Sequence, residues 1–163
     1  MESIIAHGRM DFIRSKKPDG CVFCKSSIRD SSLILFEEGG VFVIMNKYPY
    51  NTGHLLIIPE RHISRLEDLT QDERVSMFDQ LDLSVRILQE VMNPQGFNIG
   101  MNLGEAGGAG IADHIHLHVV PRWAGDTNFM TCVANTRVTP EDVQVTCEKL
   151  KTHFQQKRTG KTK

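Results

Sequence analysis

Short apolar runs separated by turn residues follow one another along the first half of the chain. The runs at residues 33–38 and 41–46 flank Gly39-Gly40, and a two-glycine turn between two such runs is typical of a β-hairpin. Further apolar runs cover residues 54–58, 97–103 and 114–120, the last ending at Pro121. These runs predict five strands, of which the first two form a hairpin.

After Thr70 the spacing of the apolar residues changes to that of a helix. Thr70 and Glu73 have the spacing of a capping box, and apolar residues then recur every three or four positions as far as Asn93-Pro94. We expect this stripe to pack in the core; it consists of Val75, Phe78, Leu81, Val85, Leu88 and Met92. A second helix is expected to start in the segment 139–142, with Thr139 as its N-cap and Pro140 in its first turn.

The order of these elements predicts an α+β fold with an antiparallel sheet rather than a parallel one. A length of 163 residues fits one domain. We assign residues 1–148 to this domain. Residues 149–163 are expected to form the end of the C-terminal helix and a frayed basic tail.

The charge is unevenly distributed. The formal net charge is −1, but residues 149–163 hold six of the 19 basic groups and none of the 20 acidic ones. The body of the protein, residues 1–148, therefore has 13 basic and 20 acidic groups and a net charge of −7. Such a body argues against a nucleic-acid partner. No apolar run reaches the roughly 18 residues of a membrane span, and we see no signal peptide. We therefore expect a cytoplasmic protein without disulfides, in which Cys132 and Cys147 are ordinary half-buried thiols.

Three histidines alternate with apolar residues at the last of the predicted strands. On a strand His114, His116 and His118 would point to one face. Such a row can chelate a metal, or a neutral imidazole in it can act as a nucleophile. Six of the 13 glycines lie between Gly96 and Gly110, and a glycine-rich loop lets backbone N–H groups surround an anion. The two features together favour phosphate chemistry.

The segment 114–120, His-apolar-His-apolar-His-apolar-apolar, resembles the signature of the histidine-triad (HIT) family of nucleotide hydrolases and transferases. Residues 46–59 also resemble that family, with Asn-x-x-Pro-x-x-x-Gly-His followed by an apolar run and proline. Asn102-Leu103-Gly104 is similar to the start of the family's phosphate loop. The resemblance extends over residues 21–129, about two thirds of the chain.

This resemblance implies the HIT fold: a five-stranded antiparallel sheet with one long helix and a C-terminal helix, the sheet continuing across a homodimer. It also implies that His116 attacks an α-phosphorus and forms a covalent nucleotidyl-histidine, while His118 donates a hydrogen bond to the phosphate. An imidazole with an ordinary pKa of about 6.5 is neutral enough for such an attack. The resemblance adds Asn102 to this catalytic group. The further residues expected to bind the nucleotide are Ile44, Asn46, His54, Gly107, Gly108, Gly110, Arg122 and Trp123.

Cys21 and Cys24 have the two-residue spacing of a metal knuckle, and no second pair of this kind exists in the chain. In zinc-bearing relatives the remaining ligands occupy the positions of His62 and His114. Two cysteines and two histidines would make a closed, structural zinc site. A pair of metal-free thiols and a metallohydrolase with zinc on all three histidines of the row are the alternatives.

Residues 121–129, Pro-Arg-Trp-x-Gly-Asp-x-Asn-Phe, resemble the bacterial branch of diadenosine tetraphosphate phosphorylases and hydrolases. We therefore expect cleavage of dinucleoside polyphosphates, with water or inorganic phosphate as acceptor. A nucleoside phosphoramidase and a non-catalytic nucleotide-binding module are the alternatives. Trp123 either stacks on a second base or fills a core, and Phe129 is expected in the core.

The loop before the histidine row departs from the family pattern. Many members carry Gln or Ser there, but residues 107–113 contain neither, which leaves assistance to the leaving group unassigned. Because the body is acidic, Mg²⁺ bound to the substrate is expected to assist turnover.

Overall fold

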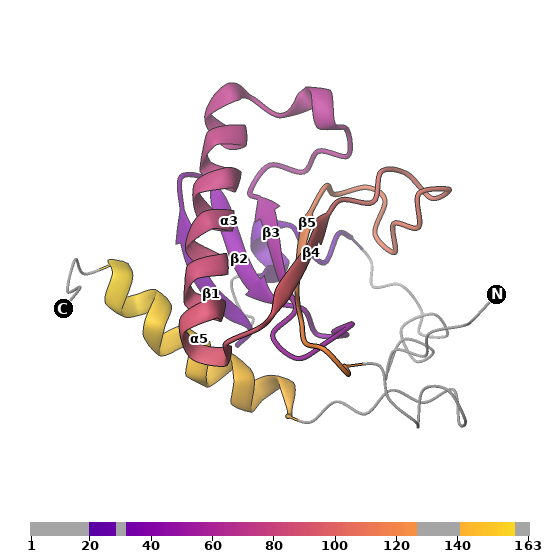
Figure 1. The fold of residues 1–163 in the computed structure, drawn as a ribbon. Helices are drawn as coiled ribbons and strands as arrows, with labels where there is room; N and C mark the ends of the chain where they lie inside the picture. Colours follow the sequence, from indigo (N-terminus) through magenta and orange to yellow (C-terminus); the bar gives the residue numbers. More distant parts are fainter. Residues whose placement is uncertain (1–19, 29–31, 127–140, 159–163) are drawn as a thin grey trace.

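The structure is a computed structural model that describes residues 20–28, 32–126 and 141–158. Its centre is an antiparallel sheet with the strand order β1-β2-β3-β5-β4 (Figure 1). The strands are β1 (Ile34–Glu38), β2 (Val41–Met45), β3 (Leu55–Pro59), β4 (Gly96–Gly100) and β5 (Leu117–Arg122). The predicted α+β class and the five-stranded antiparallel sheet are confirmed.

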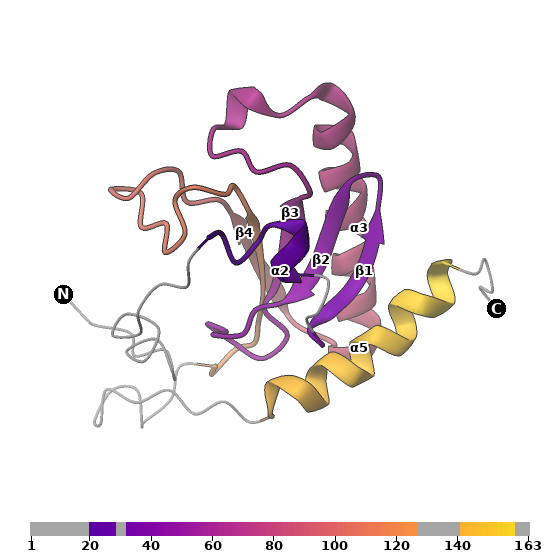
Figure 2. The same cartoon turned by 180° about the vertical axis from the view of Figure 1, so that it is seen from behind.

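Helices cover both faces of this sheet. They are α2 (Lys25–Ile28), the 3₁₀ turn η1 (Leu66–Asp68), α3 (Gln71–Met92) and α5 (Val143–Arg158). The long α3 lies in front of the sheet in Figure 1, and α2 lies in front of it when the molecule is turned round in Figure 2. In the described part of the chain, no helix is both long and apolar enough to cross a membrane.

The predicted hairpin between β1 and β2 is confirmed. Gly39 and Gly40 have φ angles of 61° and 73°, the left-handed conformation that a tight hairpin turn requires at both central residues. A Cβ atom at Gly39 would also lie 2.5 Å from Oγ of Ser76 in α3. Glycine is therefore needed at this position both for the turn and for the close approach of the helix.

The start of α3 is as predicted, and so is its buried face except at two residues near the N-terminus of the helix. The Thr70 hydroxyl accepts from the Glu73 backbone N–H, and the Glu73 carboxylate accepts from the Thr70 N–H, which completes the capping box. Val75 and Phe78, expected in the core, are 54% and 67% exposed. The buried side chains are Glu73, Met77, Gln80, Ser84, Ile87 and Leu88. The rest of the predicted stripe is in place, since Leu88 is buried and Leu81, Val85 and Met92 pack against the core. The prediction is wrong only at Val75 and Phe78, because Met77 faces the core there instead, and periodicity does not show which neighbouring apolar position packs on the sheet.

The boundaries of three other elements, β4, β5 and α5, also differ from the prediction, and β4 ends at Gly100 and not at residue 103. Helix α5 begins at Val143, after the predicted start, and the Asp142 carboxylate accepts from the Gln144 N–H.

Among the residues that the sequence singled out, the proposed cap Thr139, Phe129 and Cys132 lie outside the described residues. Cys147, expected to be half-buried, is fully buried in the core.

β5 begins at Leu117, so His114 and His116 precede it, and it continues through Pro121. The physical reason for the late start is that the Ile115 N–H donates to the Ile63 carbonyl, 2.7 Å away, and not to a strand of the sheet.

Two apolar clusters occupy the two faces of the sheet. Leu117 and Val119 of β5 belong to the larger cluster, which includes residues of α3 and α5. His118 lies opposite Leu56 in the ladder, and Leu56 belongs to the smaller cluster, which contains Phe23 and Ile28 from the α2 region. The histidine row therefore lies on the face of the sheet that α2 covers, away from α3 and α5.

Candidate active site and metal centre

Three histidine rings lie together on this face. The ring centres of His116 and His118 are 4.9 Å apart, and those of His54 and His118 are 5.1 Å apart. His54 is fully buried and His116 is 5% exposed. Segments 64 residues apart in the chain thus supply one compact group of imidazoles.

The backbone fixes the tautomer of His116. Its Nδ1 lies 2.8 Å from the carbonyl oxygen of His114, and a carbonyl oxygen can only accept a hydrogen bond. Nδ1 therefore carries the proton, and the lone pair is on Nε2. Burial lowers the pKa of His116, although the bond to the His114 carbonyl opposes this shift. The ring is therefore neutral at neutral pH, as a nucleophile must be.

A second chain of hydrogen bonds sets the tautomer of His118. The backbone N–H of Tyr50 donates to Nδ1 of His54 over 3.0 Å, so that nitrogen carries no proton. Nε2 of His54 must then donate to Nδ1 of His118, 2.9 Å away. This leaves the proton of a neutral His118 on Nε2, the form that donates to a negatively charged oxygen.

The sequence reasoning missed two aromatic residues of this site. The ring of Tyr50 stacks on His54 with centres 5.0 Å apart, and the ring of Phe23 lies 5.0 Å from that of His116. Phe23 stands between the two cysteines of the knuckle, and that position was the only signal available for it. Tyr50 lies within the 46–59 motif but is not one of the residues that define it.

Of the expected nucleotide-binding residues, Ile44 and Asn46 lie beside this group. Ile44 packs in the apolar cluster with Phe23 and Leu56. The side-chain amide of Asn46 is 3.2 Å from Nδ1 of His54, and its oxygen accepts from the Tyr48 N–H. Asn46 thus supports the conformation of the loop before β3.

The glycine-rich loop is exposed and ordered by its own hydrogen bonds. The Asn102 side chain donates to the Gly108 carbonyl over 3.2 Å, and the Gly108 N–H donates to the Glu105 carbonyl over 2.9 Å. A Cβ atom at Gly107 would collide with the Leu103 carbonyl oxygen, so only glycine fits there. The Gly108 amide would have to leave Glu105 to reach a phosphate.

Cys21, Cys24, His62 and His114 lie together, with all their candidate ligand atoms within 4.8 Å of one another. Cys21 Sγ is 3.3 Å from Nδ1 of His114, and Cys24 Sγ is 3.3 Å from Nδ1 of His62. In a tetrahedral zinc site a sulfur and a nitrogen ligand are about 3.6 Å apart. The described residues therefore fit zinc in number, chemistry and spacing.

Neighbouring groups influence the protonation state of two of these candidate ligands, His114 and Cys21. Nε2 of His114 lies 2.9 Å from the Pro59 carbonyl and must donate to it, so Nδ1 presents its lone pair toward Cys21. Burial raises the pKa of the Cys21 thiol, while the Phe23 N–H donates to its sulfur over 3.4 Å and favours the thiolate. A buried thiolate is stable here only beside a positive charge, which a metal ion supplies.

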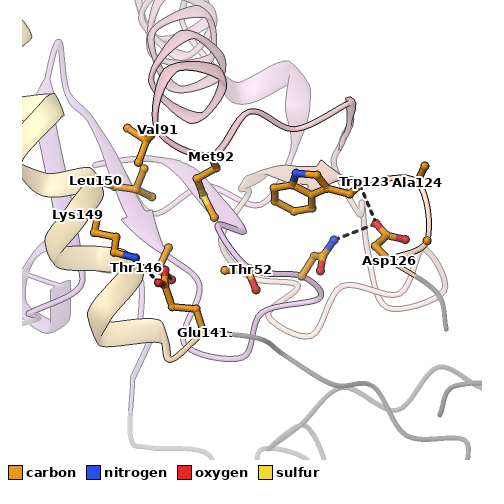
Figure 3. A pocket seen from close by; sticks show the side chains of 12 residues that line it. Thr52, Val91, Met92, Trp123, Ala124, Asp126, Glu141, Thr146, Lys149 and Leu150 are labelled. Atoms are coloured by element: carbon orange, nitrogen blue, oxygen red, sulfur yellow. Dashed lines mark hydrogen bonds and ion pairs between the residues drawn. The ribbon is translucent and has the colours of Figure 1, made fainter. Parts of the chain in front are cut away.

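Arg122 and Trp123 are placed differently from the other predicted residues. Arg122 donates two hydrogen bonds to the Asp126 carboxylate, at 2.6 and 2.8 Å, and a third to Asn98. Its charge is thus paired within the fold. Trp123 lines a separate cavity with residues of α3 and α5 (Figure 3), so the structure does not bring it to the histidine row.

The fold and this site define an α+β protein with a row of buried histidines beside a group of two cysteines and two histidines that could hold a metal ion. The model of the HIT domain matches residues 29–125. This chain belongs to the HIT family.

Known proteins of that family resemble the chain over half of its length or more. The AP-4-A phosphorylase of Mycobacterium tuberculosis is 41% identical over 125 residues, which cover 77% of this chain and 64% of that relative. The chain thus spans less than two thirds of the length of that curated relative. The asymmetrical bis(5'-nucleosyl)-tetraphosphatase of Schizosaccharomyces pombe is 33% identical over 82 residues, half of this chain and 44% of that protein.

A solved structure is also similar. The Zn-bound histidine triad family protein from Mycobacterium smegmatis superposes with a TM-score of 0.69 at 29% identity, covering 86% of this chain and 97% of that one.

Proposed function

We propose that this protein cleaves dinucleoside polyphosphates of the diadenosine tetraphosphate type by transferring a nucleotidyl group through His116. The observation that carries the proposal is the neutral, buried His116 whose Nδ1 is tied to the His114 carbonyl. The 41% identity to the M. tuberculosis AP-4-A phosphorylase supports the substrate class.

The first step follows from the tautomers. The Nε2 lone pair of His116 attacks the α-phosphorus, a P–N bond forms, and the P–O bond to the departing nucleoside polyphosphate breaks. Nε2–H of His118 donates to the phosphate as negative charge develops there. One preorganised donor of this kind is worth roughly 3–4 kcal/mol. Splitting one hard displacement into two easier ones is the gain from covalent catalysis.

In the second step water or inorganic phosphate attacks the same phosphorus and frees Nε2 of His116. Water releases AMP and phosphate releases ADP. In this proposal Ile44 and Asn46 lie on the nucleoside side, His54 orients His118, and Asn102 shapes the loop whose Gly107 and Gly110 amides hold phosphate oxygens. The pairing of Arg122 with Asp126 favours a structural role for this arginine.

We assign zinc to Cys21, Cys24, His62 and His114. Bound zinc would crosslink the knuckle, the segment after β3 and the start of the histidine row. His114 then serves twice, because its ring holds the metal and its carbonyl orients His116. This is why His114 needs no role in catalysis itself.

Three further properties belong to the proposal. The protein forms a homodimer whose interface includes the exposed edge strand β4, which carries Ile99 at 47% exposure, and the exposed side chains of Val75 and Phe78 on α3. It works in the cytoplasm, where the thiols of Cys21 and Cys24 stay reduced. Mg²⁺ accompanies the polyphosphate and offsets part of its repulsion by the acidic body.

The deciding experiment is a turnover assay with diadenosine tetraphosphate, with and without inorganic phosphate, in which all products are identified. ADP plus ATP indicates phosphorolysis and AMP plus ATP indicates hydrolysis, whereas ADP alone would indicate hydrolysis between the middle phosphates and would contradict attack at the α-phosphorus. Mass spectrometry of the quenched enzyme should find a nucleotidyl adduct on His116, and the His116→Asn variant should give neither adduct nor product. Absence of turnover and adduct in the wild-type protein would leave only a binding module. Cleavage of an AMP amide in place of the polyphosphate would favour a phosphoramidase.

A further inference from the structure

A second cavity lies away from the histidine row. Its volume is about 560 Å³, within the range of sites that bind drug-sized molecules. The walls come from the C-terminal end of α3, from α5, from the loop before β3 and from the turn after β5 (Figure 3). Because α3 and α5 pack on the opposite face of the sheet from His116, the proposed reaction makes no use of this cavity.

One side of the cavity is aromatic and apolar. Trp123 supplies an indole ring, and Met92, Val91 and Leu150 supply aliphatic and thioether groups. A Cβ atom at Gly53 would lie 2.8 Å from the Met92 sulfur, so glycine there lets Met92 rest against the loop. An indole together with a polarisable thioether is well suited to contact a flat ring.

The charges around the cavity are already paired. The Asp126 carboxylate accepts from Arg122 and from the Asn51 amide. The Glu141 carboxylate accepts from Lys149 and from the Thr146 hydroxyl. The two negative charges are thus balanced by the two positive charges of Arg122 and Lys149. Among the described lining residues, no positively charged side chain is left unpaired to hold a phosphate. The chemistry therefore fits an uncharged ligand.

Thr52 is a lining residue of this cavity whose buried hydroxyl has no hydrogen-bond partner among the described residues. The residue is 6% exposed. Buried hydroxyls in native proteins are usually bonded, and each exception calls for an explanation. Thr52 lines the cavity together with Trp123 and Met92 (Figure 3). A ligand atom in the cavity would supply the missing partner.

We propose that this cavity is a second binding site, which takes an uncharged heteroaromatic molecule of nucleoside size. The ring of the ligand packs against Trp123, and one of its polar atoms bonds to the Thr52 hydroxyl. Binding here is independent of the chemistry at His116, so this inference and the proposed function can fail separately.

Trp123 is the only tryptophan of the chain, and its fluorescence therefore reports on this cavity alone. The probe is adenosine, titrated to roughly millimolar concentration, a range that detects weak binding. We expect a saturable change in emission that persists when AMP saturates the histidine site. Thr52→Val should raise the Kd about fivefold, as expected for the loss of one hydrogen bond. The matched control is Thr152→Val, on α5 but outside the cavity.

Ala124→Phe is a second variant, because it narrows the rim at an exposed position and does not depend on how Thr52→Val folds. It should also weaken binding. No change in emission with adenosine would overturn the proposal. The proposal also fails if AMP abolishes the change, or if Thr52→Val and Ala124→Phe both bind like the wild type, since the ligand would then lie elsewhere.

Discussion

Nε2 of His54 lies 2.9 Å from Nδ1 of His118, and the backbone N–H of Tyr50 determines which of the two carries the proton between them. A main-chain group on the loop before β3 therefore decides the tautomer of a side chain on β5. In the proposed mechanism His54 is a positioning residue, which acts on the substrate only through His118.

This relay can be tested by replacing His54. His54→Leu removes the donor to His118 and should lower kcat about 100-fold, the usual scale for losing a positioned proton donor, with a smaller effect on KM. His54→Gln can still donate an amide N–H and should recover part of the loss. Steady-state kinetics measure kcat and KM of both variants, and the comparison is made between proteins of equal thermal stability. Equal activity of the Leu and Gln variants would contradict the relay.

The metal cluster predicts a loss of both metal and stability on mutation. Cys24→Ser should abolish zinc binding and lower the melting temperature by about 10 °C, because the proposed ion would crosslink three segments of the fold. Metal analysis and thermal unfolding measure this. Cys147→Ser is the control, since it removes a buried thiol outside the cluster and should keep a full complement of zinc. Retention of zinc by a Cys21→Ser/Cys24→Ser double variant would instead favour a site on the histidine row.

Glu73 should make stability depend on pH in acid. Hydrogen bonds from the Arg61 guanidinium, opposed by burial, lower the pKa of Glu73 from 4.5 to about 2. A depressed carboxyl pKa stabilises the fold above the unfolded value, and this contribution is lost as the pH falls from about 5 to about 2.

Because Arg61 is half exposed, we expect a contribution of only about 1–2 kcal/mol. Denaturant unfolding of Glu73→Gln should therefore differ from the wild type at pH 7 and converge with it near pH 2. Glu67→Gln, which removes an exposed acid, is the control and should show little difference throughout. A constant gap between Glu73→Gln and wild type over this range would refute the assignment.

The exposed apolar face of α3 bears on the oligomeric state. Val75 and Phe78 are among the most exposed large apolar side chains of the described residues, and exposed groups of this kind often mark an interface. We expect a dimer by sedimentation, and Phe78→Glu should shift it toward monomer. Val145→Glu provides a matched control, because Val145 is 45% exposed on α5 and lies away from this face. A wild-type monomer at all concentrations would exclude the homodimer.

Salt and magnesium should distinguish local from long-range recognition of phosphate. Residues 1–148 carry a net charge of −7 and cannot attract a polyphosphate through their overall field. Raising the salt concentration from about 0.05 to about 0.3 M should therefore change kcat/KM less than about threefold. Mg²⁺ should raise it, by cancelling part of the substrate charge. A steep salt dependence would show that distant charges contribute.

Much of this fold was predictable because its signals are local. Two glycines specify the hairpin turn, and Thr70 with Glu73 specifies the start of α3 through hydrogen bonds three residues apart. The period of two in the histidine row placed His116 and His118 on one face, even though the regular strand begins only at Leu117. The grouping of Cys21, Cys24, His62 and His114 came from resemblance, and the structure brings these four together.

What the sequence determined alone is therefore the order of the elements, the position of their turns and caps, and the residue types available for chemistry. Tertiary structure decided which apolar residues near the start of α3 are buried, which ring nitrogen of each histidine carries a proton, and that Phe23 and Tyr50 pack on the histidine rings. It also separated Trp123 from them. The physical reason is that these properties depend on contacts between segments far apart in the chain, whose packing and hydrogen-bond partners no local pattern specifies.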